Sequence, residues 1–583
     1  MVKATEAVKY FYEKHIWFIS VFHNKMKGKR IIEYNKERNL SNILIRALEI
    51  LSSKRGIKYL IYTSSFIFFF SLILLPPIFG ILMKMDRIWE IYESPDLLER
   101  ANSAILWSFV TAFLVSALDL IAGLPLAWFI VRSRSRLINI IDTLADLPFL
   151  VPTAALGYSA LIFWGQPDGL SWLFGMNTLI PPGFALVILL HFCFSYPVIV
   201  RVMVGELLNY REVYEIAAKT LGAQPFTAVR TITMPMLKYG LITSFLLAFA
   251  RSLSETGATV IVAGTFENGP VFIYRNLDKS EGVIVYVGSL LILTSILFFL
   301  LIRFLAPKLK LPFKRVWPGF ERELSSSRTL KIRDLTALSV FLFFVMIPSL
   351  FISLPMVNAL FDGTLISALS GSKPWGDFWY SMFISYSIGF IATLTNILTG
   401  LPIAIAIARK KLGGATPILD ALINIPIVVP SIALGVSLGF FWEGLGLIPE
   451  FWVLVLSHIT ITYTYFVMSM TAAIEGILPE IEEVASTLGA QPFTIFRRII
   501  LPLTKYSIFS GAVLVFTRSV GETGAAKAVS RSIKTAPVLL VEWIKGTEPL
   551  PISPSTRALG IGFLILASFI TLLILRVTVR GKK

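Results

Sequence analysis

Two short phrases place ion pairs inside segments that are otherwise apolar. They occupy residues 250–259, ARSLSETGAT, and residues 517–526, TRSVGETGAA. In each phrase an arginine precedes a glutamate by four residues, which puts both side chains on one face of a helix. Charged side chains near the middle of a membrane span are costly and usually face a bundle interior or an aqueous cavity. The pairs are Arg251 with Glu255 and Arg518 with Glu522.

Two interpretations of these phrases stay open. The two ions of each pair can neutralise each other and lock neighbouring helices together. Alternatively, the helix loosens at the Thr-Gly dipeptide that follows each glutamate, and the phrase lines or gates a pathway through the membrane. The candidate pathway residues are Arg251, Ser254, Glu255, Thr256, Gly257, Arg518, Glu522, Thr523 and Gly524.

The other polar residues of the apolar segments predict packing rather than catalysis. His191 and Cys193 are two positions apart and do not share a helix face, so we expect packing or interhelical hydrogen bonds rather than a metal site. We expect interhelical hydrogen bonds from Asp119 and Asn396 as well. The histidines form no ligand-spaced cluster. The sequence therefore predicts no catalytic residue, no metal site and no cofactor bound to this chain.

The elements that carry these phrases are membrane helices. Of the 583 residues, 55% are hydrophobic and only 15% are charged, and the mean hydropathy is +0.74. These values indicate an integral membrane protein. Long Leu/Ile/Phe runs without alternation favour helices over barrel strands, so we expect an all-α, polytopic fold with about twelve spans. The predicted spans are 60–83, 103–131, 138–163, 183–205, 237–264, 282–305, 335–358, 379–407, 416–441, 451–473, 504–529 and 556–577.

The distribution of charge predicts the orientation of the spans. The formal net charge of +17 comes from Lys and Arg that gather in alternate loops and at both ends of the chain. By the positive-inside rule these loops and both termini are cytoplasmic. The same distribution makes a nucleic-acid partner improbable and a lipid bilayer the expected surroundings, in a cell membrane.

The chain repeats itself. The eight residues TLGAQPFT occur at 220–227 and again at 487–494, an offset of 267 that also relates the two ion-pair phrases. Both copies contain six predicted spans in the same orientation, so we expect two parallel repeats around a pathway at their interface. The expected segments are a cytoplasmic basic arm (1–58), a first six-helix module (59–306), a cytoplasmic basic linker (307–333) and a second six-helix module (334–583).

The repeated octapeptide lies in a predicted cytoplasmic loop between the fourth and fifth spans. Its glycine breaks one short helix and its proline can open a second one. Loops usually vary more than the spans they connect, so two like loops indicate two docking surfaces for two copies of one partner. The candidate docking residues are Glu215, Ala217, Ala218, Gly222, Ala223, Pro225, Glu482, Glu483, Ala485, Gly489, Ala490 and Pro492.

These loops resemble the EAA motif of permease subunits of binding-protein-dependent ABC importers. The resemblance covers both six-span halves, although Ile216 stands where the motif usually has glutamate and Val484 replaces an alanine. It implies a transport subunit rather than an enzyme, with two copies of an ABC ATP-binding subunit and an extracytoplasmic solute-binding protein as partners. ATP and Mg would be bound by the partner subunits, since no G-x-x-x-x-G-K-S/T sequence occurs here.

The resemblance leaves the substrate open. Fused twelve-span permeases of this kind are similar to those of iron(III) and thiamine importers, whereas the ion-pair phrases resemble the Glu-x-Gly-Ala segment of molybdate and sulfate permeases. A small inorganic ion, either iron(III) or an oxyanion, is the preferred expectation. A thiamine importer and a secondary transporter with a duplicated bundle are the alternatives.

Overall fold

A computed structural model describes residues 49–50, 52, 54–133, 137–146, 148, 151–305, 308, 318–549 and 551–580. The predicted basic arm, 1–58, lies almost wholly outside the described residues, as does the first part of the predicted linker, 307–333. Throughout the described ranges the chain forms helices and connecting turns and no strand. The all-α expectation is confirmed.

The first half contains α3 (Arg55–Phe68), η1 (Phe69–Leu74), α4 (Leu75–Leu82), η2 (Met85–Glu93), α5 (Pro95–Arg132), α6 (Leu137–Leu144), α8 (Thr153–Gly165), η3 (Leu170–Phe174), α9 (Phe184–Asn209), α10 (Val213–Thr220), α11 (Pro225–Ala228), η4 (Val229–Thr233), α12 (Met234–Met236), α13 (Lys238–Ser254), α14 (Gly257–Val262), α15 (Gly269–Asn276) and α16 (Glu281–Leu305).

The second half contains α17 (Pro318–Leu324), α18 (Ser327–Val340), η6 (Phe341–Met346), α19 (Ile347–Leu350), α20 (Ser353–Phe361), α21 (Thr364–Ser370), α22 (Trp375–Ala408), η7 (Gly413–Ala415), α23 (Thr416–Ile423), α24 (Ile425–Val428), α25 (Ser431–Leu445), α26 (Glu450–Glu475), α27 (Pro479–Thr487), α28 (Pro492–Ile495), η8 (Phe496–Ile500), α29 (Leu501–Val520), α30 (Gly524–Val529), α31 (Ala536–Lys545) and α32 (Pro554–Arg580).

Among the described residues, nine helices are long and apolar enough to cross a membrane, and two bent helix pairs raise the number to eleven. The bent pairs are Pro225–Met236 with Lys238–Ser254, at 71°, and Gly413–Val428 with Ser431–Leu445, at 101°. These eleven elements correspond to eleven of the twelve predicted spans. The twelfth, predicted at 138–163, is not one helix.

Prolines explain the two interrupted third spans. Pro152 and Pro430 have extended ψ angles and directly precede α8 and α25. Proline has no N–H to donate into a helix and disfavours helical backbone at the residue before it. The sequence predicts a kink at these prolines, and the structure shows a break at each.

The chain divides into two compact units. The smaller unit comprises residues up to Ile61 together with Leu478–Pro502, and the larger unit comprises the rest. In the smaller unit α27 and α28 enclose a small apolar core made by Ala485, Ile495 and Ile499. In the larger unit the second and fourth spans of each half run along each other, α5 beside α9 and α22 beside α26.

The first span of the first half packs on the third span of the second half. The Ser437 hydroxyl on α25 accepts a hydrogen bond from the Ile81 N–H at 2.8 Å and donates one to the Pro77 carbonyl. A side chain at Gly80 would collide with the backbone of α25, since its Cβ would lie 1.7 Å from the Ser437 carbonyl oxygen. Glycine therefore permits this close approach.

The first span of the second half packs on the third span of the first half in the same way. On α8, the Ser159 hydroxyl donates to the Pro348 carbonyl at 2.6 Å and accepts from the Ile352 N–H at 3.0 Å. Ser159 and Ser437 occupy matching places in the two repeats. In each half, the first span thus packs against the third span of the other half.

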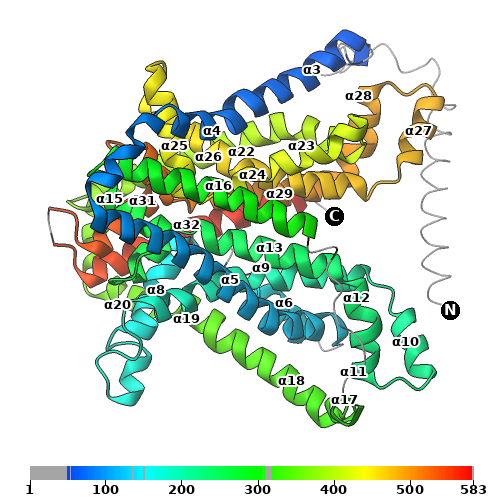
Figure 1. Ribbon diagram of the computed structural model, residues 1–583, viewed down its shortest axis with the longest axis horizontal. Coiled ribbons are helices and arrows are strands. Elements are labelled where there is room, and N and C mark those ends of the chain that lie inside the picture. The colour runs from blue at the N-terminus through cyan, green and yellow to red at the C-terminus, as the bar shows by residue number, and fades with distance from the viewer. Residues whose placement is uncertain are drawn as a thin grey trace. The chain divides into compact units, whose positions relative to one another are not determined.

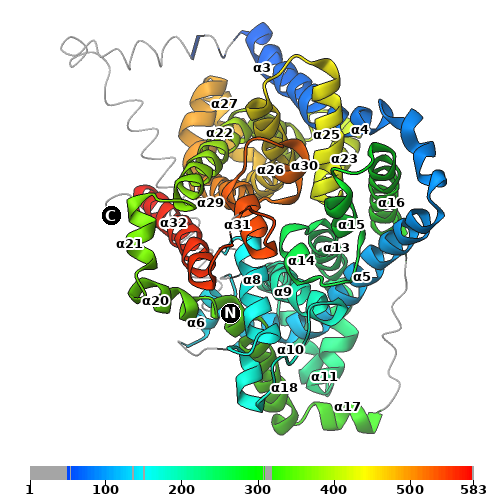
Figure 2. The same ribbon diagram turned by 90° about the vertical axis from the view of Figure 1, so that its left-hand side faces the viewer.

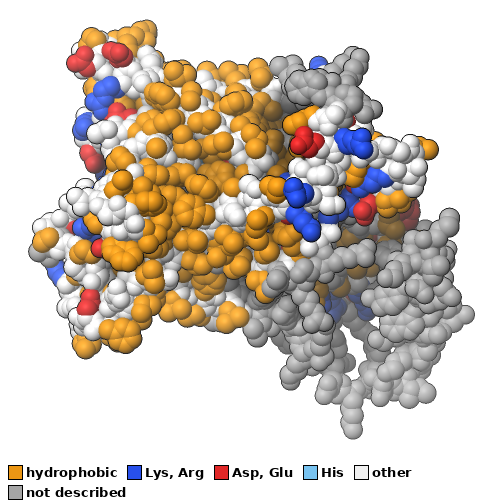
Figure 3. Space-filling model, turned by 90° about the horizontal axis from the view of Figure 1, so that it is seen from below, with side chains coloured by type: hydrophobic (Ala, Val, Ile, Leu, Met, Phe, Trp, Pro, Cys, Tyr) orange, Lys and Arg blue, Asp and Glu red, His pale blue; other side chains and the backbone are white. Residues whose placement is uncertain are grey.

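The larger unit separates its polar ends from its apolar middle. In Figure 1, α10, α11 and α17 lie together at one end of this unit, and α15 and α31 lie at the opposite end. Figure 2 shows α8, α14 and α31 side by side near its centre, in agreement with their mutual contacts. On the face seen in Figure 3, hydrophobic side chains cover a broad middle band and charged side chains lie beyond it. Such a band matches a lipid-facing surface.

Candidate functional site

The fifth span of each half is interrupted at the ion-pair phrase. In the first half α13 ends at Ser254 and α14 begins at Gly257, and in the second half α29 ends at Val520 and α30 begins at Gly524. The backbone of Glu255 between the two helices is extended, with ψ of 129°. The predicted loosening at the two Thr-Gly dipeptides is therefore present in the structure.

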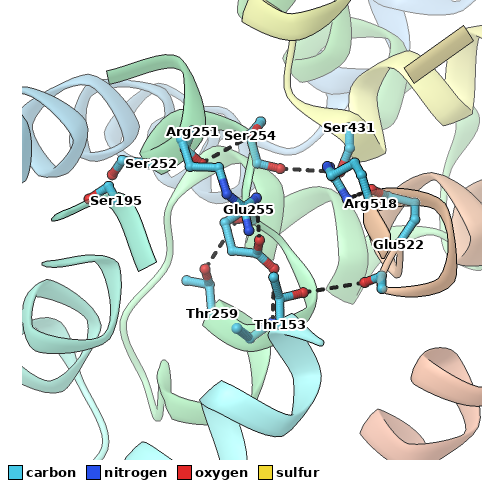
Figure 4. A network of polar contacts seen from close by, with 12 residues as sticks. Thr153, Ser195, Arg251, Ser252, Ser254, Glu255, Thr259, Ser431, Arg518 and Glu522 are labelled. Atoms are coloured by element: carbon cyan, nitrogen blue, oxygen red, sulfur yellow. Dashed lines mark hydrogen bonds and ion pairs between the residues drawn. The ribbon is translucent and has the colours of Figure 1, made fainter. Parts of the chain in front are cut away.

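The first ion pair is satisfied within its own segment (Figure 4). The Arg251 guanidinium lies 2.9 Å from a carboxylate oxygen of Glu255. The other carboxylate oxygen accepts the Ala258 N–H at 3.3 Å, at the start of α14. The Phe194 ring lies under the guanidinium, 4.9 Å from its carbon. The carboxylate thus neutralises the arginine and caps the helix that follows.

The second ion pair repeats this arrangement. Arg518 pairs with Glu522, and the Ala525 N–H donates to the Glu522 carboxylate at 3.0 Å. Both carboxylates are buried, with 4% of Glu255 and 2% of Glu522 exposed. Each phrase therefore carries a buried carboxylate paired with a partly buried guanidinium, and no net charge.

The two phrases meet face to face. A Cβ added at Gly257 would lie 2.5 Å from Thr523, and one added at Gly524 would lie 2.7 Å from the Thr256 hydroxyl. The Ser431 hydroxyl of the second half donates to the Ser254 carbonyl of the first half at 3.1 Å (Figure 4). The candidate pathway residues of both halves are thus brought together in one buried contact.

The threonines at this contact are buried and unpaired. Thr256 is 1% exposed and Thr523 is 2% exposed. Neither hydroxyl has a hydrogen-bond partner among the described residues. A buried hydroxyl without a partner is costly. The contact between the halves therefore holds two hydrogen-bonding groups that packing alone does not explain.

Two further glycines, which the sequence interpretation did not include, hold the third spans against the short helices. A Cβ at Gly157 would lie 2.8 Å from the Ala258 Cα, and a Cβ at Gly435 would lie 2.6 Å from the Ala525 Cα. In the sequence, these two glycines are marked by the Leu-Gly dipeptide that recurs at 156–157 and 434–435. These glycines let α8 approach α14, and α25 approach α30, at backbone distance.

The histidines stabilise the same region. The ring nitrogens of His191 lie 2.8 Å from the hydroxyls of Ser252 and Thr259, on α13 and α14. His458 makes the matching contact with Ser519 at 2.9 Å, but Ala526 stands where the first half has Thr259. The prediction of interhelical hydrogen bonds for His191 is confirmed. The described residues hold no group of three or more His, Cys, Asp or Glu that could bind a metal.

Asp119 and Asn396 also make the predicted interhelical bonds. The Ser195 hydroxyl of α9 donates to the Asp119 carboxylate on α5. The Asn396 amide on α22 donates to the Thr462 hydroxyl on α26 at 2.8 Å. Ser195 and Thr462 occupy matching positions in the repeats. The two long helix pairs are therefore fastened in the same way.

The first candidate docking loop is a helix, a glycine turn and a second helix. α10 ends before Gly222, which has φ of +92°, and α11 begins at Pro225. Leu221, next to the turn, is 89% exposed, and Ile216 is 50% exposed. Such exposure of large apolar side chains is typical of a surface that binds a partner. Of the predicted docking residues, Ala217 and Gly222 are exposed, and Ala218, Ala223 and Pro225 are half-buried.

The second loop has the same design within the smaller unit. α27 ends before Gly489, with φ of +83°, and α28 begins at Pro492. Leu488 and Val484 are 55% and 48% exposed. Of the predicted docking residues, Glu483, Gly489 and Pro492 are exposed, Glu482 and Ala490 are half-buried, and Ala485 is buried.

Glu215 differs from the predicted docking glutamates of the second loop because its side chain is buried. It is 3% exposed and contacts Lys219 at 2.6 Å and Arg132 at 3.2 Å. The Thr233 hydroxyl also donates to it at 3.2 Å. Glu215 therefore ties α10 to α5 and η4, while Glu483 at the second loop is open to solvent.

At the opposite end of the larger unit, one ion pair occurs twice with its charges exchanged. In the first half Arg275 on α15 lies 2.9 Å from Glu267, and in the second half Lys534 lies 2.7 Å from Glu542 on α31. The offset of 267 matches Glu267 with Lys534 and Arg275 with Glu542. Lys527, which replaces Val260 of the first half, adds a second cation 2.8 Å from Glu542.

The duplicated architecture agrees with a comparison against known families. Residues 119–311 and 400–580 each match the family described as "Binding-protein-dependent transport system inner membrane component". The two matches cover more than half of the chain. The chain belongs to this family. It is accordingly a multi-pass permease component of a transport system, of the inner-membrane type.

Individual relatives match between 33% and 39% of the chain. "Molybdenum transport system permease protein ModB" of Mycobacterium tuberculosis is 30% identical over 228 residues, which are 38% of this chain and 85% of the relative. "Sulfate transport system permease protein CysT" of Escherichia coli is 28% identical over 250 residues, 39% of this chain and 87% of the relative. A probable sulfate permease, cysT of Marchantia polymorpha, is 34% identical over 196 residues, 33% and 67% of the two chains.

Proposed function

We propose that this permease forms the translocation pathway of an ATP-driven importer of a small oxyanion of the molybdate and sulfate class. Both termini and both docking loops lie in the cytoplasm, and a solute-binding protein delivers the substrate on the other side. Two copies of an ABC ATP-binding subunit hydrolyse ATP and bind Mg. The chain itself supplies the pathway between its two halves.

The observation that carries this proposal is the exposed apolar turn present in both loops. Leu221 and Leu488 stand beside left-handed glycines and are 89% and 55% exposed. A large apolar side chain gains about 1.5–3 kcal/mol when it is buried, so each turn favours a partner that covers it. A secondary transporter has no need for two such surfaces.

The preference for an oxyanion rests on two supports. The relatives named above are molybdate and sulfate permeases, and the ion-pair phrases resemble theirs. In addition, each arginine at the contact is already neutralised, so a substrate there meets hydroxyl groups rather than free charge. The unpaired hydroxyls of Thr256 and Thr523 are hydrogen-bond donors suited to oxyanion oxygens.

Docking is tested by Leu221→Asp combined with Leu488→Asp. The expected result is loss of the ATP-binding subunit during co-purification, because each substitution places a charge in an apolar contact. Leu447→Asp is the matched control, since Leu447 is 76% exposed in a loop that follows α25. Retention of the ATPase by the double variant would contradict the docking assignment.

Substrate class is tested by uptake into proteoliposomes that contain the complete transporter and its solute-binding protein. We expect ATP-dependent uptake of labelled sulfate or molybdate, and no uptake of iron(III) or thiamine. Thr256→Val with Thr523→Val should reduce this uptake while leaving ATPase binding unchanged. ATP-dependent uptake of iron(III) or thiamine, or full uptake without ATP, would overturn the proposal.

A further inference from the structure

The second helix of each docking loop begins without a cap of its own. Pro225 opens α11, and the side chain of the preceding Gln224 makes no capping hydrogen bond. The second loop is the same at Pro492 and Gln491. The first N–H groups of a helix have no partner within the helix and need one from elsewhere. The identity of that partner shows what holds the loop.

In the first loop the partners come from α17 and from the turn that follows it. The Phe226 N–H donates to the Ser325 hydroxyl at 3.0 Å, and the Thr227 hydroxyl donates to the Glu321 carboxylate at 2.6 Å. The same carboxylate pairs with Arg230 at 2.7 Å, and Glu321 is 4% exposed. A serine and a glutamate outside the loop therefore act as its N-cap and complement its helix dipole.

In the second loop the partner comes from the segment before α3. The Phe493 N–H donates to the Ser52 hydroxyl at 3.2 Å, and the Thr494 hydroxyl donates to Glu49 at 3.0 Å. The donor atoms and the acceptor types are the same as in the first loop. All four residues belong to the smaller compact unit.

The two capping segments share a sequence and a place in the chain. Leu-Ser-Ser occurs at 51–53 and again at 324–326, each time with a glutamate three or four residues before the capping serine. Both segments lead directly into the first span of a half. These are the first spans to which Ser159 and Ser437 of the opposite halves donate hydrogen bonds. Each loop is thus capped by a segment of the opposite half. The first span of that same opposite half also packs on the half that contains the loop.

We propose that Glu49 with Ser52, and Glu321 with Ser325, are positioning residues that clamp each docking loop to the first span of the opposite half. This inference rests on the proposed role of the loops in ATPase docking. When an ATP-binding subunit displaces its docking loop, the loop moves the first span of the opposite half with it. Closure of one ATP-binding subunit therefore moves both halves of the permease. The clamp also explains why a threonine occurs at the same place in both loops, since its hydroxyl is one of the clamped groups.

The test uses the complete transporter in proteoliposomes and measures solute transported per ATP hydrolysed. Glu321→Arg opposes Arg230 and removes the acceptor of the Thr227 hydroxyl. We expect it to lower this ratio by about fivefold or more, the low end of coupling between sites, while the ATPase stays bound. The melting temperature falls as well, because Glu321 is 4% exposed and pairs with Arg230. Glu323→Arg is the matched control, because it makes the same charge change at an exposed position of the same helix. Arg230→Glu combined with Glu321→Arg should restore the ratio.

A cross-link tests the second clamp. Cys193 is buried, so a short bis-maleimide reagent should cross-link Glu49→Cys to Thr494→Cys with little background. An unchanged coupling ratio in Glu321→Arg, or failure of the double variant to restore it, overturns the clamp and leaves ATPase docking intact. Absence of the cross-link overturns the second clamp. A wild-type chain that binds no ATP-binding subunit overturns the proposed function and the clamp together.

Discussion

The substitution Glu522→Gln tests the role of the buried ion pairs most directly. It keeps the shape of the side chain but leaves the Arg518 guanidinium, 12% exposed, without its counter-ion. Removing one partner of a buried pair costs about 3–5 kcal/mol. With an unfolding entropy of about 2.1 cal/mol/K per residue, this cost lowers the melting temperature of 583 residues by about 2.5–4 °C. The assay is thermal unfolding of the purified protein in detergent.

The double variant Arg518→Met with Glu522→Gln separates mutual neutralisation from other effects. Because it removes both charges, it should recover most of the lost stability. Glu443→Gln, the same change at an exposed glutamate of α25, is the control and should leave the melting temperature unchanged. If Glu522→Gln melts at the wild-type temperature, or if the double variant is as unstable as the sum of its single variants, the pair does not neutralise itself.

Two further predictions concern packing and pH. Gly435→Ala should destabilise the protein by about 1–3 kcal/mol, because its Cβ would lie 2.6 Å from a backbone carbon of α30; Gly414→Ala, with no atom within 4 Å, should not change the melting temperature. Burial raises the pKa of Glu267, but hydrogen bonds, chiefly from Arg275, outweigh it and hold this pKa below its ordinary value of 4.5. The stability that results is present above pH 4.5 and is lost as the pH falls through the lowered pKa. Glu267→Gln should therefore flatten the acid side of a melting-temperature profile, and an unchanged profile would contradict the assignment.

Much of the fold could be predicted because its signals are local. Long apolar runs mark eleven of the twelve spans, and the repeated octapeptide marks the paired loops. The Thr-Gly dipeptides mark the breaks in the fifth spans because glycine and a preceding polar residue weaken a helix at one point. The third span at 138–163 was predicted as one span kinked at Pro152, whereas the structure interrupts the helix there.

The rest depends on contacts between residues that are far apart in sequence. Ser159 and Ser437 look like ordinary small residues in apolar helices, yet they bind first spans about 190 and 360 residues away. The capping serines Ser52 and Ser325 lie in polar segments where no periodicity marks them. Glu215 fitted the motif by type, but only the fold shows that its carboxylate faces Arg132. Local pattern cannot supply such pairings.

The exchanged ion pairs show what joining two repeats in one chain permits. In a symmetric homodimer, matching positions carry the same residue, so an arginine would stand at the position of Arg275 in both halves. Here Glu542 takes its place in the second half, and Lys534 takes the place of Glu267. Each pair keeps its internal attraction while the two halves present opposite polarity at α15 and α31. A solute-binding protein with two unlike lobes would meet two unlike surfaces there and could dock in only one of the two orientations that the pseudo-symmetry offers. Exchanging Lys534→Glu with Glu542→Lys makes these two positions alike in sign in both halves, and adding Lys527→Val and Glu548→Gln removes the two charges that would otherwise repel the exchanged pair. It should weaken binding of that protein while leaving the melting temperature unchanged, and binding at the wild-type level would refute this account of the asymmetry.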